Sequence, residues 1–185
     1  MKKYLAVLVL ILLSFGNTVT NSKENNTNLN QLFKQLKKCD NSTTAAEIEM
    51  KIWKIWYTHP TEKKLTQLLE KGSDLISKGE LEVAHKIFST IINSAPNWAE
   101  GWNKRATVLY LMGRYQDSLN DIDEVLKLEN SHFGALSGRG LVQIKLGNYE
   151  KAIESYQDAQ KIYPSIDSAK VMIPRIKKLI KDSAI

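Results

Sequence analysis

Residues 99–130 read AEGWNKRATVLYLMGRYQDSLNDIDEVLKLEN, and residues 133–164 read FGALSGRGLVQIKLGNYEKAIESYQDAQKIYP. The two stretches align when one is shifted by 34 residues, and a weaker third copy, KGSDLISKGELEVAHKIFSTIINSAP, occupies residues 71–96. This register places Gly79, Gly113 and Gly147 at equal spacing. A repeat of this length is typical of two antiparallel helices per unit, stacked so that each unit buries the apolar face of its neighbour.

The aligned positions have physical roles in such a helical pair. Glycine readily takes the left-handed backbone conformation that ends a first helix, which explains the three glycines. Pro96 and Pro164 fall where a second helix has to stop, because proline cannot continue a helix. Small side chains recur where the two helices of a unit approach closely, namely at Gly72, Ala106 and Gly140 and at Ala84, Ser118 and Ala152.

On these positions the chain resembles the tetratricopeptide repeat (TPR) family over residues 65–98, 99–132 and 133–166. The resemblance implies an all-α fold, an α-solenoid of TPR helical hairpins. The apolar N-terminus and the segments LFKQLKKC (residues 32–39) and AEIEMKIWKIW (residues 46–56) also make the chain similar to short exported TPR proteins of alphaproteobacteria. That similarity implies a periplasmic location and brings no known reaction with it.

Two helical segments flank the repeats and are predicted to cap the stack. Residues 29–60 carry apolar side chains at helical spacing and form an N-terminal helical cap that is expected to cover the first hairpin. Its second helix is predicted to open with a capping box of Thr44 and Glu47. Residues 167–185 are predicted as a C-terminal capping helix, in which Pro174 causes a kink or a late start.

The first residues are predicted to direct export. Lys2 and Lys3 precede an apolar run over residues 4–13, and small residues follow, so residues 1–20 are typical of a signal peptide. The run is too short for a membrane span, which needs about 20 apolar residues. Residues 21–28 are polar and predict a flexible leader. The alternative is an uncleaved N-terminal segment that anchors the protein in the inner membrane and is its one membrane contact.

Composition and charge exclude several classes of function. The formal net charge of +6 is modest and is not clustered as in nucleic-acid-binding proteins, so no nucleic-acid partner is expected. Cys39 and the three separated histidines give no metal-ligand spacing, and Cys39 is interpreted as a small buried side chain or a dimer-forming thiol. The chain has no phosphate-binding loop and no nucleophile motif. The sequence therefore predicts no cofactor, no metal, no small-molecule substrate and no enzyme activity.

A protein-binding groove is expected on the concave side of the stack. Counted from residues 65, 99 and 133, positions 2, 5, 9 and 12 of each first helix lie about 140° from the packing positions 4, 7, 8 and 11. They mix amide, hydroxyl and apolar groups, which suits a peptide or a helix of a partner protein. The predicted groove residues, with two at its edge, are Leu69, Ser73, Ile76, Glu100, Asn103, Thr107, Tyr110, Leu111, Ser137, Leu141, Ile144 and Lys145.

Three other interpretations stay open at this point. In the first, the concave side is a solvated surface without a specific ligand. In the second, the protein is a structural accessory subunit of a cell-envelope assembly. Its convex face and the side chains of Trp53 and Trp56 are then buried in that assembly, and its groove is idle and binds no partner. These aromatic residues lie at helical spacing, however, and are more simply predicted as core. The third interpretation is an enzyme whose site carries no known motif.

One well-known function of the TPR family, the docking of chaperones, can be tested on single positions. The family members with this function clamp a C-terminal carboxylate with lysine, asparagine and arginine side chains at fixed positions of three repeats. The matching positions here are Leu69, Ser73, Lys104, Gly134 and Gly138, and none carries the required residue type. A carboxylate clamp is therefore not expected.

Position 7 of each repeat departs from the usual leucine and carries Lys71, Arg105 and Arg139. One hypothesis is a basic row that meets an acidic partner. The favoured hypothesis is that the aliphatic part of each Lys or Arg side chain lies on its own hairpin. Its charged group then pairs with an acidic side chain of the second helix. The acids available to the two arginines are Asp121, Asp123 and Glu124, and Glu154 and Asp158, respectively.

Overall fold

The computed structural model describes residues 27–183, and it is helical throughout that part of the chain. The predicted signal peptide and most of the predicted leader lie outside the described residues. Residues 27 and 28, predicted as the end of the leader, belong instead to a helix over residues 27–37. This helix is followed by α2 (Ser42–Tyr57), α3 (Lys63–Ser77), α4 (Leu81–Ser94), α5 (Ala99–Leu111), α6 (Tyr115–Leu128), α7 (Phe133–Lys145), α8 (Tyr149–Ile162) and α9 (Asp167–Ser183).

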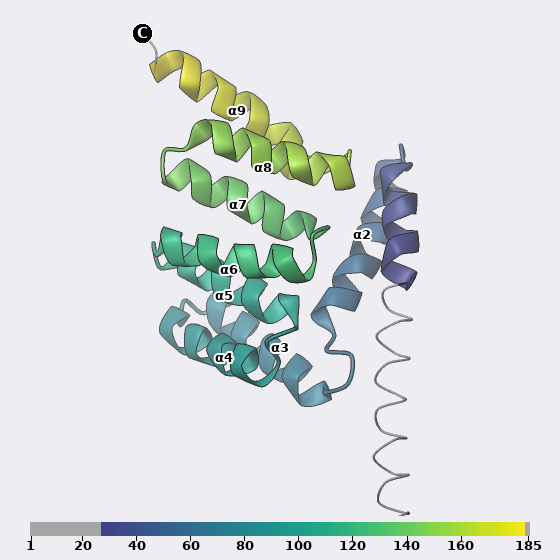
Figure 1. The fold of residues 1–185 in the computed structure, drawn as a ribbon, viewed down its shortest axis with the longest axis vertical. Helices are drawn as coiled ribbons and strands as arrows, with labels where there is room; N and C mark the ends of the chain where they lie inside the picture. Colours follow the sequence, from purple (N-terminus) through teal and green to yellow (C-terminus); the bar gives the residue numbers. More distant parts are fainter. Residues whose placement is uncertain (1–26, 184–185) are drawn as a thin grey trace, which may run out of the picture.

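Six of these helices form three stacked hairpins, α3–α4, α5–α6 and α7–α8 (Figure 1). Each first helix contacts its own second helix, and α5 and α7 also contact the second helix of the preceding hairpin. The predicted all-α solenoid of TPR hairpins is therefore confirmed. At the end of each first helix the glycine has a positive φ, 75° at Gly79, 76° at Gly113 and 77° at Gly147. The next residue donates its N–H to a carbonyl five residues back, for example from Glu80 to Leu75 at 2.9 Å.

Small residues allow the two helices of a hairpin to approach closely. A Cβ atom added at Gly140 would lie 2.6 Å from the ring of Tyr156, and one added at Gly72 would lie 2.6 Å from the ring of Phe88. Both rings are fully buried. The glycines at position 8 are therefore required by packing against the second helix.

Gly140→Ala is expected to lower the free energy of unfolding by about 1–2 kcal/mol, because the overpacked ring of Tyr156 has to move and a Gly-to-Ala gain in helix propensity only partly offsets that cost. Gly138→Ala, two residues earlier on α7, is the matched control. Its Cβ would meet only Ile122, at 3.9 Å, so it is expected to stabilise the protein by up to about 1 kcal/mol. Urea unfolding of both variants measures the difference, and equal effects would contradict this account.

The N-terminal helices lie along one edge of the stack, beside the connections between hairpins (Figure 1). The sequence predicts that they cover the first hairpin, but only the end of α2 reaches it, where Tyr57 packs against the apolar cluster of α3. Residues of both helices share an apolar cluster with α7, α8 and α9, which includes Leu36, Trp56, Phe133 and Ile176. The N-terminal segment therefore connects the first hairpin to the far end of the stack.

Aromatic contacts hold α2 in this position. The Trp56 ring stacks on His132, with the ring centroids 3.9 Å apart and the planes 7° from parallel. The Trp56 carbonyl accepts a hydrogen bond from Trp98 Nε1 at 2.9 Å. A Cβ atom on Gly134 would lie 2.5 Å from the Trp53 ring. Trp53 and Trp56 thus serve the packing of the chain itself, as the simpler prediction for these residues states.

The start of α2 also differs from the prediction. The N-cap residue is Asn41, whose side-chain oxygen accepts the N–H of Thr44 at 3.0 Å. The helix therefore begins at Ser42, earlier than a capping box of Thr44 and Glu47 would allow. Asparagine is as good an N-cap as threonine or better, which explains the earlier start.

Helix α9 occupies the place of a first helix in a fourth repeat. Asp167 follows Phe133 by 34 residues, and α9 contacts α8 and α7 just as α7 contacts α6 and α5. Ser137 and Ser168 form a hydrogen bond across the α7–α9 contact, with 2.9 Å between their hydroxyl oxygens. The helix begins at Asp167 and includes Pro174, so of the two alternatives predicted from that proline, a kink or a late start, the late start is wrong.

His59 joins the end of α2 to the start of α3. Its Nδ1 accepts the N–H of Glu62 at 2.9 Å, its own N–H donates to Thr66 Oγ1, and its ring meets Trp98 edge-on. Burial lowers the pKa of His59 below its ordinary value of 6.5, and the nearby Glu62 carboxylate opposes that shift only in part. The folded protein therefore resists protonation of this imidazole more than the unfolded chain does.

The stability of the protein is expected to decrease as the pH falls from 7 to 5. Unfolded His59 takes up a proton near its ordinary pKa while folded His59 does not, so the stabilisation is present above that pKa and is lost as the pH falls through the lower, folded pKa. His59→Asn keeps an acceptor in the place of Nδ1 but does not titrate, so urea unfolding should show a smaller loss for this variant. The same pH dependence in both proteins would contradict the assignment. Burial also lowers the pKa of His85, so His85→Gln is a second variant to compare.

Candidate functional site

A cleft opens on the concave side between α5 and α7. Its volume is about 100 Å³. It contains four of the predicted groove residues, Asn103, Thr107, Tyr110 and Leu141, and its other lining residues are Ala106, Ser118, Ile122, Gly134, Ala135, Gly138 and Val142. The lining is mostly apolar. The structure therefore brings the middle part of the predicted groove together as one concave surface.

Two glycines of α7 leave this space open. A Cβ atom on Gly138 would touch only the Cδ1 atom of Ile122, at 3.9 Å, so the volume above Gly138 is not used by packing. Gly134 lies at the end of the cleft where the Trp53 ring comes close. The cleft thus exists because position 6 of the third repeat has no side chain. Neither glycine is among the predicted groove residues, although both line the cleft.

The polar groups at the cleft are held in place by neighbours on α5. Asn103 Nδ2 donates to Glu100 Oε2 at 3.1 Å, and Thr107 Oγ1 donates to the carbonyl oxygen of Asn103 at 3.0 Å. The Tyr110 ring packs against Tyr115, with 5.7 Å between the ring centroids. A partner segment would therefore meet an ordered amide and an ordered aromatic ring beside an apolar hollow.

Two predicted groove residues are wrong because their side chains are buried. Leu69 is fully buried in an apolar cluster against which Tyr57 packs. Glu100 has an exposed fraction of only 1%. Ser73 is also occupied, because its hydroxyl lies 2.6 Å from the Tyr57 hydroxyl. The end of α2 thus fills the N-terminal part of the concave side, which the repeat pattern does not reveal.

The remaining predicted groove residues extend the open part. Ile76, Ser137 and Ile144 are half-buried, and the hydroxyl group of Ser137 forms a hydrogen bond with that of Ser168. Leu111 and Lys145 are exposed. The accessible groove therefore runs from α5 across α7 towards α9.

A buried polar cluster lies under α2 and was not predicted. His132 is completely buried, and its Nδ1 accepts the N–H of Ala135 at 3.0 Å, which places the ring proton on Nε2. Nε2 faces Glu100 Oε2 at 3.3 Å, and Lys104 Nζ lies 3.5 Å from the other oxygen of Glu100. The cluster pairs Glu100 with Lys104 and joins the second repeat to the third through the contact between Glu100 and His132. Its only sequence signal is a histidine at the N-cap of α7.

The structure supports the favoured hypothesis for the basic row. Arg105 forms a two-pronged pair with Asp121, with Nε–Oδ2 at 2.7 Å and Nη2–Oδ1 at 2.8 Å. Arg139 lies 3.5 Å from Asp158. The Asp121 carboxylate raises the pKa of Arg105 above its already high value, although burial works against it. Two of the three cations are thus held by acids of their own hairpin, while Lys71 is exposed.

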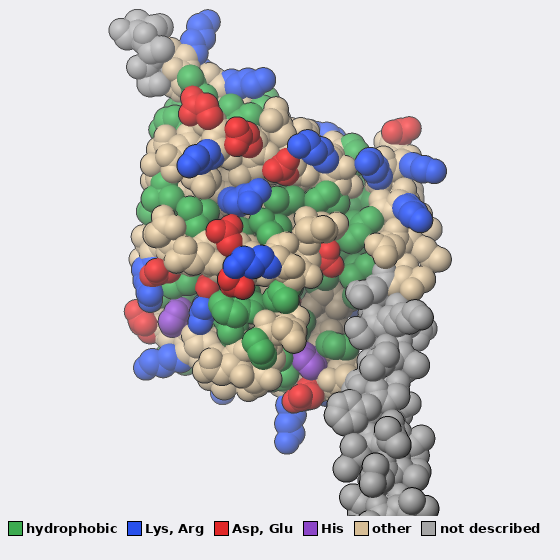
Figure 2. All heavy atoms as spheres, viewed as in Figure 1, with side chains coloured by type: hydrophobic (Ala, Val, Ile, Leu, Met, Phe, Trp, Pro, Cys, Tyr) green, Lys and Arg blue, Asp and Glu red, His purple; other side chains and the backbone are tan. Residues whose placement is uncertain are grey.

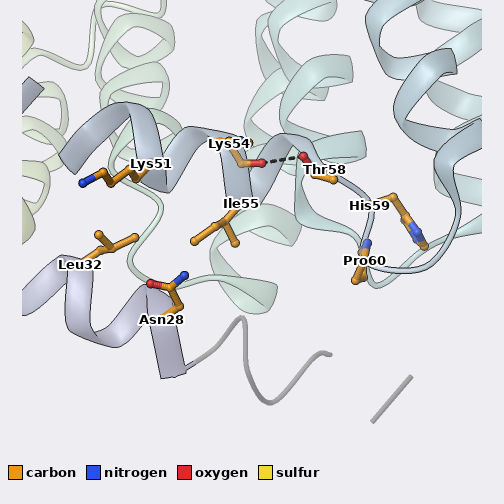
Figure 3. Close-up of a pocket in the computed structure, with 8 residues that line it drawn as sticks. All are labelled: Asn28, Leu32, Lys51, Lys54, Ile55, Thr58, His59 and Pro60. Carbon is orange, nitrogen blue, oxygen red and sulfur yellow. Dashed lines mark hydrogen bonds between the residues drawn. The ribbon is translucent and has the colours of Figure 1, made fainter. Parts of the chain in front are cut away.

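A larger hollow of about 430 Å³ lies away from the groove, between the 27–37 helix and the end of α2 (Figure 3). Leu32 and Ile55 form its apolar side, and Lys51, Lys54 and His59 are also at its wall. None of the predicted groove residues lines it. Its polar side chains are exposed or half-buried, so it has the character of a surface hollow between two helices.

Within residues 27–183, no three or more His, Cys, Asp or Glu side chains come together in a group that could hold a metal ion. Over the same residues, no helix combines the length and the apolar character that a membrane crossing requires.

The fold and the concave cleft define a protein of the helical-hairpin solenoid class. The family model for the tetratricopeptide repeat matches residues 103–165. A TPR repeat-containing protein of Rhizobium etli is 31% identical over 145 residues, which cover 78% of this chain and 71% of that protein. The chain therefore belongs to the tetratricopeptide repeat family.

Solved structures agree on the fold. The Sgt2 TPR domain from Aspergillus fumigatus has a TM-score of 0.63 at 18% identity and covers 66% of this chain and 83% of its own. The first TPR of Spaghetti (RPAP3), bound to the HSP90 peptide SRMEEVD, has a TM-score of 0.61 at 20% identity, with 64% of this chain and 94% of that chain covered.

Proposed function

We propose that this protein is a non-catalytic interaction module that holds a peptide or a helix of a partner protein in its concave groove. The observation that carries the proposal is the open, mostly apolar cleft above Gly138, flanked by Asn103 and Tyr110. Exposed apolar hollows with a few ordered polar groups are typical of binding sites. The TPR family is built for protein–protein interaction, and a solved relative carries a bound peptide, which supports this use of the groove.

The setting that we propose is the bacterial periplasm. The support is the sequence of residues 1–20, with two lysines, a short apolar run and small residues. Fusion of β-lactamase to the C-terminus of the full chain tests this part. Resistance to ampicillin is expected for the full chain and not for a variant without residues 4–13, and equal resistance would overturn the assignment. Release of the fusion by osmotic shock would separate a cleaved, soluble form from an anchored form.

The competing role as an accessory subunit with an idle groove would use the convex face together with Trp53 and Trp56, and the two tryptophans are not available for it. That role needs Trp53 and Trp56 on the outside, but Trp56 has an exposed fraction of 6% and Trp53 packs over Gly134. Groove binding is therefore the function that the geometry supports best.

In-cell crosslinking tests the groove directly. A photoreactive amino acid at position 110 lies at the cleft, and the same amino acid at Val83, which is exposed on α4, is the control. Capture of one protein from position 110 and not from position 83 is the expected result. Gly138→Leu should abolish that capture because the leucine side chain fills the cleft while its Cβ has room. Gly138→Ala should retain most of it.

Two outcomes would overturn groove binding. The first is capture from position 83 but not from position 110. The second is undiminished capture by Gly138→Leu in a protein whose circular dichroism and melting temperature match those of the original chain.

A further inference from the structure

The concave surface continues from α7 onto α9. In the α5–α7 cleft, Tyr110 at position 12 of the second repeat lies across from Leu141 at position 9 of the third. The Ser137–Ser168 hydrogen bond shows that α9 packs on α7 in the same register, because it joins position 5 of one repeat to position 2 of the next. By this register, Arg175 at position 9 of α9 lies across from position 12 of α7. Helix α9 therefore adds a further wall to the groove.

This wall carries unpaired positive charge. Lys145 on α7 and Arg175 and Lys178 on α9 occupy concave positions and are exposed. None of the three forms an ion pair with another residue of the described chain. Several cations of the second helices, by contrast, are paired within their own helix, for example Lys127 with Glu124 at 2.6 Å and Lys161 with Asp158 at 2.7 Å.

The concave positions hold almost no negative charge to balance these cations. Over the second repeat, the third repeat and α9, the concave positions 2, 5, 9 and 12 and the adjoining positions 6 and 13 contain one acid, Glu100, which is buried beside His132 and Lys104. The face that carries α4, α6 and α8 mixes both signs (Figure 2). The positive character is thus a property of the groove and not of the whole surface.

We infer that the partner segment is acidic, with an apolar side chain in the α5–α7 cleft and Asp or Glu residues that meet Arg175 and Lys178. The inference rests on the proposed function and names the chemistry of its ligand. Neighbouring packed helices are about 8–10 Å apart, and an extended chain advances about 3.3 Å per residue. The acidic residues therefore follow or precede the apolar residue by about three positions. No free C-terminus is required, because the cations lie one repeat beyond the positions of a carboxylate clamp.

A protein segment fits these observations better than a lipid surface or a nucleic acid. A ligand bound by charge alone would make no use of the apolar cleft beside Tyr110. Only three cations lie on the groove wall, since Lys170 and Lys177 occupy other positions of α9, and three are fewer than the four to eight that commonly recruit anionic lipids. The occupant to which the structure points is thus a peptide that is both apolar and acidic.

Peptide pools with amidated C-termini test the inference on the full chain. One pool places a Leu, Phe or Met residue three positions from a run of four Glu residues, in a background of Ala, Gly and Ser. A second pool replaces the Glu run with Lys, and a third moves the Glu run to eight positions away. Fluorescence anisotropy should show that the first pool binds about tenfold more tightly than the other two, and the preference should shrink as salt rises from about 50 to about 500 mM.

Charge reversal on α9 supplies the matched variants. Arg175→Glu with Lys178→Glu should weaken binding of the acidic pool about tenfold. Lys170→Glu with Lys177→Glu makes the same change in charge at packing positions 4 and 11 of α9, which are exposed because no second helix follows. This pair should change affinity by less than about twofold.

The outcomes separate this inference from the proposed function. If all pools bind equally and Gly138→Leu abolishes binding, groove binding stands and the acidic partner is wrong. If no pool binds, the inference and the groove function both fail. Unchanged affinity after reversal of Arg175 and Lys178 overturns the inference, as does tighter binding to phosphatidylglycerol vesicles or to a 20-nucleotide DNA than to the acidic pool.

Discussion

Replacing Trp56 by alanine is expected to lower the free energy of unfolding by about 3–5 kcal/mol, the range found for large aromatic residues in a core. The side chain has an exposed fraction of 6%, stacks on His132 and touches Phe133, with 5.1 Å between the two ring centroids. Its loss would leave a cavity between α2 and α7 that the rigid hairpins cannot close. It would also expose the buried contact between His132 and Glu100 to water.

Met50→Ala is the matched control for Trp56→Ala. Met50 lies on the same helix but has an exposed fraction of 64%, so its replacement should change the free energy of unfolding by less than about 0.5 kcal/mol. Urea unfolding followed by circular dichroism measures both variants.

The helices that are destabilised by Trp56→Ala give a sharper test than the change in the free energy of unfolding. Because α2 shares its core with α7, α8 and α9, amide hydrogen exchange in Trp56→Ala should rise most in those helices. If the N-terminal helices capped the first hairpin, exchange would rise in α3 and α4 instead. That second pattern would contradict the packing described above.

The repeats could be predicted from the sequence because their signals are local. Gly113 ends α5 through its own backbone conformation, and Gly140 is small because Tyr156 lies in the same hairpin. Such requirements recur every 34 residues and can be seen without the structure. The position of α2 has no such signal. It depends on Trp56 meeting His132, two residues far apart in the sequence whose contact no periodic pattern records.

The same reason explains which of the predicted groove residues lie at the open cleft and which do not. Helix geometry alone places Asn103, Thr107, Tyr110 and Leu141 on the concave side, and the structure finds them at one cleft. Leu69, Ser73 and Glu100 have the same angular positions but lie under the end of α2 or beside it. An angle on a single helix cannot show that another part of the chain already covers it.

A final expected result concerns the row of Lys71, Arg105 and Arg139. Asp121→Ala should lower the free energy of unfolding by about 3 kcal/mol, because it leaves the largely buried guanidinium of Arg105 without its carboxylate. Arg105→Leu restores the usual residue of the repeat but leaves the Asp121 carboxylate buried, so it should also destabilise. The double variant Arg105→Leu with Asp121→Ala should recover much of the loss, since neither charge then stays unpaired.

Partner capture shows whether the row of Lys71, Arg105 and Arg139 stabilises the hairpins or binds the partner. If Arg105 only holds its own hairpin together, the double variant should capture the partner from position 110 as well as the original chain does. Lys71→Leu, at the equivalent but exposed position, should likewise leave capture unchanged. Loss of capture in the double variant at unchanged melting temperature would instead assign this row to the ligand. The acidic segment would then be bound from the hairpin side as well as from α9, and the geometry of the groove would have to be revised.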